Sequence, residues 1–337
     1  MSKELGVIVP YFGPLPETFS AWVKSLEISE NIQYFLVTDQ DVPLYHVSNL
    51  RIVNMSFESV QRRVKETIDV NLHSPYKLCD LKPAYGYIFS ELLSGFTYWA
   101  YCDLDLVFGD IKEVLEQVKK DKIHKVFSKG HFSIYQNTTE INELFQVNRH
   151  NNKWHYIKNS KVIWVFDESY YGDIIGINGL VLNEGKKLLE DVSIYADVDP
   201  KKKGFFNMNR EGESCFFCLK KDCLVEVSYD PKSDLFQEKV IVYAHYQKRR
   251  VRMTNARDGV LLIYPHHWED VYSVSEGKLL LKKNIALDTE DKENMFLTRT
   301  RKKIIKAINL LSELPRIELI SIIYMKLKRI SFSKITS

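Results

Sequence analysis

"YWAYCDLDLVFGDI", residues 98–111, decides how the first half of this chain is interpreted. The segment is apolar on both sides of Asp103 and Asp105, as is typical of a strand buried in a parallel sheet. Carboxylates are rarely buried unless they are paired or bind a metal ion. On a strand, residues i and i+2 point to the same side, so we expect the two carboxylates to project together. We expect them at the carboxyl edge of the sheet, where open α/β sheets bind ligands.

The D-x-D spacing indicates a site for a divalent cation. Mg²⁺ commonly takes one or two carboxylates together with substrate phosphate oxygens, and Mn²⁺ favours similar ligands. The alternative is that both acids are solvated at a turn, or that one caps the helix expected to begin near Asp110. The apolar residues that precede Asp103 favour the metal interpretation.

Apolar strands alternate with helices through about the first 140 residues. The strands are expected at residues 5–9, 32–39, 50–57 and within 98–111, the helices at 16–28, 83–93 and 110–121, and an extended segment at 125–137. Uninterrupted apolar strands alternating with helices predict an α/β fold, with a mostly parallel sheet covered on both faces.

The second half of the chain is less regular. Strands are expected at residues 162–168, 173–183, 223–230 and 239–247, a short helix at 212–221 and late hairpins within 261–283. The sequence has no internal repeat and no low-complexity region. Its one clear change in composition comes near residue 290, where a basic tail begins.

The overall composition is that of a globular protein, with 45% hydrophobic and 27% charged residues among 337. The five cysteines are odd in number and include a single C-x-x-C, so neither a disulfide framework nor a zinc site is expected, and a reducing compartment fits best. The N-terminal apolar run is too short for a signal peptide, and no stretch is long enough to span a membrane. We therefore expect a cytoplasmic protein, soluble or peripheral to a membrane.

The basic tail holds most of the charge asymmetry. Residues 299–337 contain ten Lys or Arg and two acidic residues, a net charge of +8, which leaves −5 for the other 298 residues because the whole chain carries +3. Apolar residues recur there at helical spacing around Pro315, a pattern typical of interfacial amphipathic helices. The alternatives are packing on the rest of the protein or a dimer contact. No basic and aromatic platform accompanies the tail, so nucleic acid is not an expected partner.

A set of ordered motifs resembles a known family. The motifs span about residues 5–250 and are, in order, VIVPYFG, FLVTD, CDLKPAYGYIF, YWAYCDLDLVFGDI, GHFSIYQN, FDE, GESCFF and YAHYQKR. The set resembles bacterial glycosyltransferases of the GT-A fold that build capsular or O-antigen polysaccharides. The resemblance implies a Rossmann-like GT-A domain over residues 1–290, with a mostly parallel central sheet flanked by helices, followed by basic amphipathic helices over 291–337.

The resemblance also implies a metal site. Asp103 and Asp105 would hold Mn²⁺ or Mg²⁺, which bridges the diphosphate of a nucleotide-sugar, and Asp103 would also face the ribose and the sugar. His245 follows an apolar strand and precedes a basic run, matching a further metal ligand; the alternative is an imidazole satisfied at the end of a strand. Lys248, Arg249 and Arg250 are expected to reach phosphate oxygens, with a solvated basic turn as the alternative.

Other residues match the family's nucleotide-binding segments. Pro10, Tyr11 and Phe12, after the first strand, would cradle the base and ribose, although Tyr11 or Phe12 can equally belong to the core. Asp39, after the second strand, would contact the base or ribose. Asp80 and Lys82 precede a helix, where a lysine suits a diphosphate and the aspartate has helix capping as its alternative role. The segments 130–137 and 176–180 are expected to line the donor-sugar pocket.

The catalytic base is left open between two places. Glu213 resembles the acidic motif that precedes a helix in inverting members, but that motif usually reads Glu-Asp and here a serine follows. Asp167 and Glu168, after an apolar segment, are the other candidates. A base must lie within hydrogen-bond reach of the acceptor hydroxyl.

The resulting hypothesis is a metal-dependent glycosyltransferase that moves a sugar from a nucleotide-sugar, with a UDP-sugar as the expected donor, to an oligosaccharide or a polyprenyl-diphosphate-linked acceptor. Such an enzyme would work at the inner face of the plasma membrane, attached through residues 299–337. One rival is a nucleotidyltransferase on a related α/β fold, whose glycine-rich basic signature is missing after the first strand. The other is a non-catalytic carbohydrate-binding protein, against which Asp103, Asp105 and His245 argue.

Overall fold

The computed structural model describes residues 4–29, 31–43, 45–158, 160–168, 174–210, 213–256 and 259–289. The chain divides into two units, one made of Met1–Pro200 and Gly204–Ile285 and the other of Lys201–Lys203 and Ala286–Ser337. The basic tail and the helices expected within 291–337 lie outside the described residues. No helix among those described is long and apolar enough to cross a bilayer.

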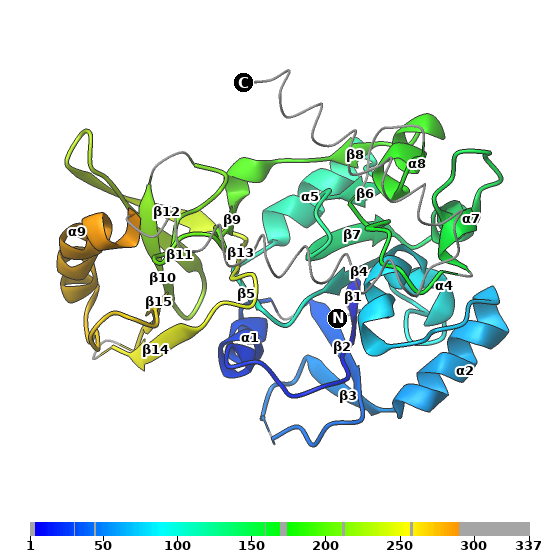
Figure 1. The fold of residues 1–337 in the computed structure, drawn as a ribbon, viewed down its shortest axis with the longest axis horizontal. Helices are drawn as coiled ribbons and strands as arrows, with labels where there is room; N and C mark the ends of the chain where they lie inside the picture. Colours follow the sequence, from blue (N-terminus) through cyan, green and yellow to red (C-terminus); the bar gives the residue numbers. More distant parts are fainter. Residues whose placement is uncertain are drawn as a thin grey trace, which may run out of the picture. The chain divides into compact units, whose positions relative to one another are not determined.

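A seven-stranded, mostly parallel sheet is the largest of the sheets described in the first unit (Figure 1). Its strands lie in the order β3 (Leu50–Asn54), β2 (Ile32–Thr38), β1 (Leu5–Pro10), β4 (Tyr98–Cys102), β7 (Phe132–Gln136), β6 (Lys125–Val126) and β8 (Leu188–Leu189). The pairs from β3 to β4 are parallel, as is β6 with β8, whereas β7 is antiparallel to both neighbours. The expected α/β fold with a large, mostly parallel sheet is confirmed.

Two smaller sheets continue the first unit. A five-stranded antiparallel sheet has the order β12 (Leu235–Ile241), β11 (Leu224–Asp230), β10 (Ser214–Leu219), β15 (Leu261–Pro265) and β14 (Val251–Asn255). A three-stranded sheet has the order β5 (Leu106–Phe108), β13 (Tyr243–His245) and β9 (Tyr195–Asp197). In Figure 1 the strands of the three-stranded sheet lie between the other two sheets.

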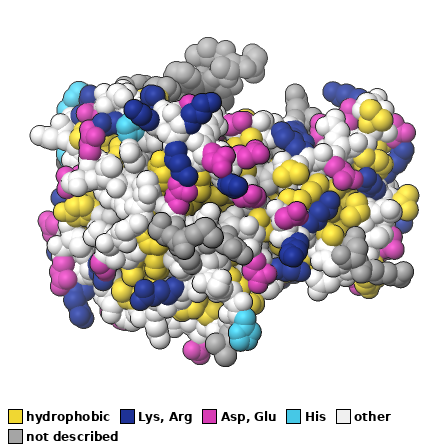
Figure 2. Space-filling view, turned by 180° about the vertical axis from the view of Figure 1, so that it is seen from behind, with side chains coloured by type: hydrophobic (Ala, Val, Ile, Leu, Met, Phe, Trp, Pro, Cys, Tyr) yellow, Lys and Arg dark blue, Asp and Glu magenta, His cyan; other side chains and the backbone are white. Residues whose placement is uncertain are grey.

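The helices are mostly short. They are α1 (Phe19–Ser25), α2 (Phe57–Ile68), α3 (Leu78–Leu81), α4 (Tyr85–Ile88), α5 (Lys112–Asp121), α6 (Thr139–Asn142), α7 (Trp154–Ile157), α8 (Ile177–Asn183) and α9 (Val274–Thr289), with 3-10 turns at Leu26–Ile28, Pro75–Lys77, Lys82–Ala84, Leu144–Gln146 and Val192–Ile194. Side chains of both charge signs are interspersed over the face in Figure 2, as on an ordinary solvated surface.

Four sequence predictions in the second half were wrong. Residues 212–221 contain the strand β10 rather than a helix, because β10 is buried on both faces and its apolar run shows no period that separates strand from helix. Residues 173–183 contain the helix α8, whose apolar Ile177, Leu180 and Val181 have helical spacing. Residues 162–168 form turns and bends instead of a strand, and the part of 261–283 after β15 includes α9 instead of a hairpin.

Three differences concern the first half. The third strand ends at Asn54, and the unpredicted helix α2 follows it. Its signals are the side chain of Ser56, which accepts a hydrogen bond from the Ser59 amide, and buried valines at Val60 and Val64. The helix expected over 83–93 is limited to α4, and the strand through the D-x-D motif is interrupted.

Candidate metal centre

The D-x-D motif occupies a turn between two strands of different sheets. Strand β4 ends at Cys102 and β5 begins at Leu106, so Asp103 and Asp105 are not successive same-side residues of one strand. The turn still lies at the carboxyl end of β4, which is parallel to β1. The expected location is therefore correct, but alternation along a strand is not the reason the two side chains meet.

Strand register brings His245 to this turn. Strand β13 pairs antiparallel with β5, with His245 opposite Leu106, and parallel with β9, with His245 opposite Asp197. The ligand atoms of Asp103, Asp105 and His245 all lie within 4.8 Å of one another. The two carboxylates suit Mn²⁺ or Mg²⁺, and the imidazole adds a nitrogen ligand of the kind that transition metals bind.

Asp105 is held from both sides of its carboxylate. Its Oδ1 lies 3.5 Å from Nε2 of His245, and its Oδ2 accepts a 2.6 Å hydrogen bond from the backbone amide of Lys248. Although burial by itself raises the pKa of Asp105, the contact with His245 and the Lys248 amide lower it below its ordinary value. Asp105 is therefore an anion, as a metal ligand must be.

The turn after His245 has an unusual backbone that reaches Asp105. Gln247 and Lys248 both have positive φ angles, 51° and 60°. Non-glycine residues seldom adopt this conformation, and it persists where surrounding contacts require it. Here it aims the Lys248 amide at Asp105, while the Lys248 ammonium lies over the ring of Tyr76, 5.1 Å from its centroid.

Asp103 is paired with a buried lysine but keeps coordination capacity. Lys82 Nζ donates to Asp103 Oδ1 at 2.7 Å and to the carbonyl of Gly130 at 2.7 Å. Burial alone lowers the pKa of Lys82, but the carboxylates of Asp103 and Asp167 raise it well above its usual range. The Asp103 side chain is 39% exposed, and no hydrogen bond from the described residues reaches its Oδ2.

His245 lies in an anionic surrounding. Its Nδ1 is 2.9 Å from Asp197 Oδ1, and its Nε2 faces Asp105. Burial alone lowers the pKa of His245, but the hydrogen bonds and charges of Asp105 and Asp197 raise it to about 9. In the metal-free protein the ring is therefore a cation at neutral pH, and a metal ion would replace its Nε2 proton.

Asp167 and Glu168 lie behind the D-x-D turn. The Gly130 amide donates to Glu168 Oε1 at 3.0 Å, and a Cβ at position 130 would clash with both carboxylates, so only glycine allows this approach. Burial raises the pKa of Asp167 to about 7, although Lys82 opposes the shift. Asp167 and Asp103 thus share the charge of Lys82, and Gly130 contacts Lys82 and both acids.

Asp80 has a structural environment. Its Oδ2 accepts from Lys77 Nζ at 2.9 Å, and both its oxygens accept from the Trp164 amide at 3.0 Å. The Phe166 amide adds a third donor at 3.4 Å. Asp80 therefore anchors the loop that carries Asp167, rather than capping a helix.

The predicted nucleotide-binding residues follow the ends of β1 and β2, and Tyr11 is the one with a shown interaction at the D-x-D turn. Tyr11 lies close enough to Asp105 and Lys248 for both charges to act on its hydroxyl, although burial is the main cause of its raised pKa. Pro10 ends β1, and the ring of Phe12 packs edge-on against Phe57 at 5.4 Å. Asp39 is exposed after β2 and accepts from the Gln40 side chain at 2.6 Å.

Glu213 lies elsewhere, beside the five-stranded sheet. Its Oε2 accepts a 2.7 Å hydrogen bond from the Ser228 hydroxyl on β11. The helix that motivated its assignment is the strand β10. The structure groups Asp167 and Glu168, but not Glu213, with the Lys82–Asp103 ion pair.

Asp197 was not predicted as a site residue, and His131 was predicted only as part of the segment 130–137 expected to line the donor-sugar pocket. Asp197 ends β9 opposite His245, and His131 stacks on His245 with ring centroids 4.1 Å apart. Asp197 had a sequence signal, since it follows the short apolar strand of residues 195 and 196. His131 precedes an apolar strand, where nothing in the sequence marks it as a neighbour of His245.

A family model matches residues 7–271 of the chain. The chain belongs to DUF6625, a family of unknown function. The match includes Asp103, Asp105, Asp197 and His245. A comparison with curated proteins gave no match.

Similar solved structures of this DUF6625 chain include glycosyltransferases. The apo form of glycosyltransferase GlyE from Streptococcus pneumoniae TIGR4 has 13% identity and a TM-score of 0.33, covering 57% of this chain and 46% of that one. The galactosyltransferase LgtC, in complex with donor and acceptor sugar analogs, has 10% identity and a TM-score of 0.34, covering 86% and 98%. The chain spans about half the length of GlyE. At these TM-scores the similarities carry no argument about fold or activity.

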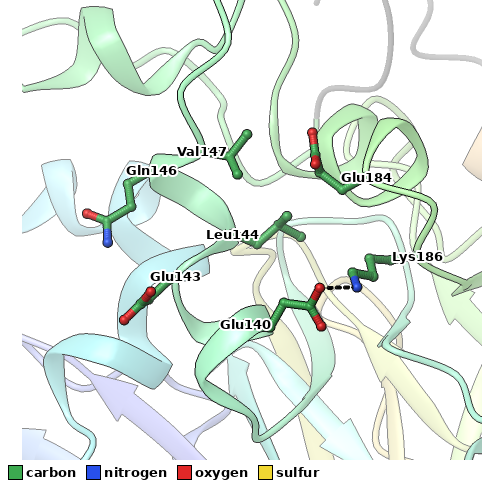
Figure 3. Close-up of a pocket in the computed structure, with 7 residues that line it drawn as sticks. All are labelled: Glu140, Glu143, Leu144, Gln146, Val147, Glu184 and Lys186. Carbon is green, nitrogen blue, oxygen red and sulfur yellow. Dashed lines mark hydrogen bonds and ion pairs between the residues drawn. The ribbon is translucent and has the colours of Figure 1, made fainter.

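A surface cavity of about 310 Å³ lies apart from the metal centre (Figure 3). Its lining residues are Glu140, Glu143, Leu144, Gln146, Val147, Glu184 and Lys186. Glu140 is ion-paired with Lys186, as the dashed line in Figure 3 shows. None of the D-x-D, His245 or Lys82 side chains lines this cavity.

Proposed function

We propose that this chain is a metal-dependent glycosyltransferase that transfers a sugar from a nucleotide-sugar, with UDP as the expected nucleotide. The observation that carries the proposal is the convergence of Asp103, Asp105 and His245 at the carboxyl end of β4. This end of a parallel sheet is where α/β proteins bind nucleotides. The D-x-D motif and its neighbours resemble those of bacterial GT-A enzymes that build surface polysaccharides.

The donor set supports a resident Mn²⁺ or Mg²⁺. Asp103, Asp105 and His245 would hold the ion, which when bound acts as a Lewis acid that neutralises charge on the departing nucleoside diphosphate. Asp103 has an oxygen that accepts no hydrogen bond from the described residues, which fits this role. Lys248 is proposed to attract phosphate oxygens, because its backbone amide bonds to Asp105 and its charge acts on Tyr11.

Neighbouring residues would bind and orient the donor. Lys82 holds Asp103 in place and supplies a fixed positive charge. Tyr11, near Asp105 and Lys248, offers a ring for stacking on the base. Pro10, Phe12 and Asp39 belong to the same two strand ends and complete the proposed base and ribose site.

Asp167 and Glu168 are the preferred candidates for acid–base chemistry. They lie beside Lys82 and Gly130, next to Asp103, whereas Glu213 is bonded to Ser228 in another sheet. A group with a pKa of about 7, as Asp167 has, suits proton transfer at neutral pH. We therefore assign the proton-accepting role to this pair rather than to Glu213.

The acceptor is proposed to be an oligosaccharide or a polyprenyl-diphosphate-linked sugar at the inner face of the plasma membrane. Support comes from the basic residues of 299–337, which lie outside the described residues. Each basic residue near an anionic leaflet contributes roughly 1 kcal/mol. Full-length protein should sediment with anionic liposomes, and replacing Lys302, Lys303 and Lys306 by glutamine should weaken this; unchanged sedimentation would contradict the membrane role.

The donor is tested with a panel of nucleotide-sugars in the presence of Mn²⁺. Each is scored for thermal stabilisation of the protein and for slow hydrolysis of the donor. A UDP-sugar should raise the melting temperature in the presence of Mn²⁺ and less so in its absence. If no nucleotide-sugar binds or reacts, the glycosyltransferase proposal is wrong.

A matched pair of variants separates the metal centre from general charge effects. Asp105→Asn should abolish Mn²⁺-dependent donor hydrolysis. Asp110→Asn changes the same charge a few residues later, where Asp110 Oδ1 accepts from the Lys112 amide, and should leave hydrolysis unchanged. Full Mn²⁺-dependent turnover by Asp105→Asn would contradict the metal assignment.

A further inference from the structure

Asp197 is fixed by the backbone around it. It lies 5% exposed at the end of β9, directly opposite His245 on β13. The Val198 amide donates to the His245 carbonyl at 3.0 Å, and the Met208 amide donates to the Asp197 carbonyl at 2.7 Å. The Asp197 amide in turn donates to Asn207 Oδ1 at 3.2 Å. Its carboxylate therefore has a defined position relative to the imidazole.

One oxygen of this carboxylate holds the proton on Nδ1 of His245, so that Nε2 is the nitrogen that can release its proton to a metal ion. Asp197 Oδ1 accepts a hydrogen bond from Nδ1–H of His245 at 2.9 Å and another from Gln247 Nε2 at 2.8 Å. A carboxylate is only an acceptor, so the proton on Nδ1 is retained. The other ring nitrogen, Nε2, then faces Asp105 and is the one that can bind a metal ion.

His131 fixes the plane of the same ring. The two imidazoles are stacked, with centroids 4.1 Å apart and planes 25° from parallel, and His131 Nε2 lies 3.1 Å from the Tyr243 hydroxyl. The lone pair of an imidazole nitrogen lies in the plane of its ring. The lone pairs of two stacked rings therefore point along parallel planes and do not converge on one metal ion. Although His131, Asp197 and His245 are close enough to form a metal-binding group, this geometry assigns His131 and Asp197 to support of the ring.

We propose that Asp197 is a positioning residue that, together with the stacked ring of His131, holds His245 with Nδ1 protonated and Nε2 aimed at the D-x-D carboxylates. This inference rests on the proposed metal site and adds the residues that orient its histidine ligand. Groups that bond to the second nitrogen of a ligating histidine commonly change metal affinity 10–100-fold when they are removed.

The test is Mn²⁺ affinity, measured by titration calorimetry on the full chain without donor or acceptor. Asp197→Ala, which removes the acceptor, should weaken Mn²⁺ binding about 10–100-fold. Asp197→Asn keeps an acceptor oxygen and should weaken it less. Asp191→Asn is the matched control: Asp191 accepts from the Ser193 amide before the same strand, and its replacement should leave affinity unchanged.

The possible failures are distinguishable. If the wild type does not bind Mn²⁺, the metal centre of the proposed function is wrong, and the positioning role fails with it. If Asp105→Asn loses Mn²⁺ binding while Asp197→Ala retains wild-type affinity, only the positioning role is overturned. Circular dichroism and melting temperature establish whether each variant is folded. If Asp197→Ala does not fold, the comparison of Mn²⁺ affinities is made with Asp197→Asn instead.

The tautomer of His245 gives a second measurement that needs no variant at Asp197. Long-range ¹H–¹⁵N spectra of the Mg²⁺-loaded wild type, assigned with His245→Gln, should show a protonated Nδ1 and an unprotonated Nε2. A protonated Nε2 in the loaded protein would overturn the proposal. In the calorimetric test, a merely structural role for Asp197 would predict wild-type Mn²⁺ affinity in every folded Asp197 variant.

Discussion

Two groups of charged residues lie on either side of Lys82 in the sequence, and their carboxylates are bonded differently. Around Asp80, Lys77 and the backbone amides of Trp164 and Phe166 occupy both oxygens. Around the D-x-D turn, Asp103 keeps one oxygen that accepts no hydrogen bond from the described residues. The first group has the satisfied bonds of a structural anchor, and the second has the incomplete bonds of a binding site. The difference predicts where substitutions reduce stability and where they reduce binding.

The largest expected effect on stability is at Asp80. Asp80→Ala leaves the buried ammonium of Lys77 without its carboxylate and releases the loop at Trp164. Breaking a buried ion pair by removing one partner costs about 3–5 kcal/mol. Urea unfolding monitored by tryptophan fluorescence measures the loss. A variant as stable as the wild type would show that Asp80 is not an anchor.

Asp167 connects the two groups, because the loop anchored by Asp80 carries it to the D-x-D turn. Its pKa is raised to about 7, so the folded protein binds a proton that the unfolded chain releases near pH 4. This contribution to stability is present below pH 4 and is lost as pH rises through 7, by an amount on the order of 4 kcal/mol. Asp167→Asn should remove this slope from unfolding free energies measured between pH 4 and 7.5. An unchanged slope in Asp167→Asn would contradict the raised pKa of Asp167.

His245 should produce a pH dependence at higher pH. Its raised pKa of about 9 means that its contribution to the stability of the metal-free protein is fully present below pH 6.5 and is lost as pH rises through 9. The loss is on the order of 3 kcal/mol. The stability difference between wild type and His245→Gln in chelator should therefore shrink between pH 6.5 and 9.5; a constant difference would rule out the protonated ring.

The smallest effect is expected at an exposed pair. Lys65, in α2, and Asp69, the residue that caps its C-terminal end, form an ion pair four residues apart, with both side chains more than half exposed. Solvent screening leaves such a pair little net energy, so Asp69→Asn should hardly alter the urea midpoint. A loss as large as that of Asp80→Ala would mean that burial does not distinguish the anchor from ordinary surface pairs.

Local patterns in the sequence were enough to predict most strands and helices in the first half of the chain. The continuous apolar runs of β1, β2 and β4 and the spacing within α1 and α5 predicted a mostly parallel sheet, since these patterns depend on near neighbours. They were insufficient for β10 and α8, where a short apolar run fits a buried strand or a helix equally well. Only the contacts on both faces of β10 decide between the two.

The sequence by itself determined that Asp103, Asp105 and His245 each follow or interrupt an apolar segment and carry groups that bind metal ions. Only the tertiary structure decided that they meet. The register of β5, β13 and β9 brings His245 between Asp105 and Asp197, and the Asp80 anchor brings Asp167 behind Lys82. Strand register and loop anchoring depend on pairing between residues far apart in the chain, and the alternation of side chains along one segment does not encode it.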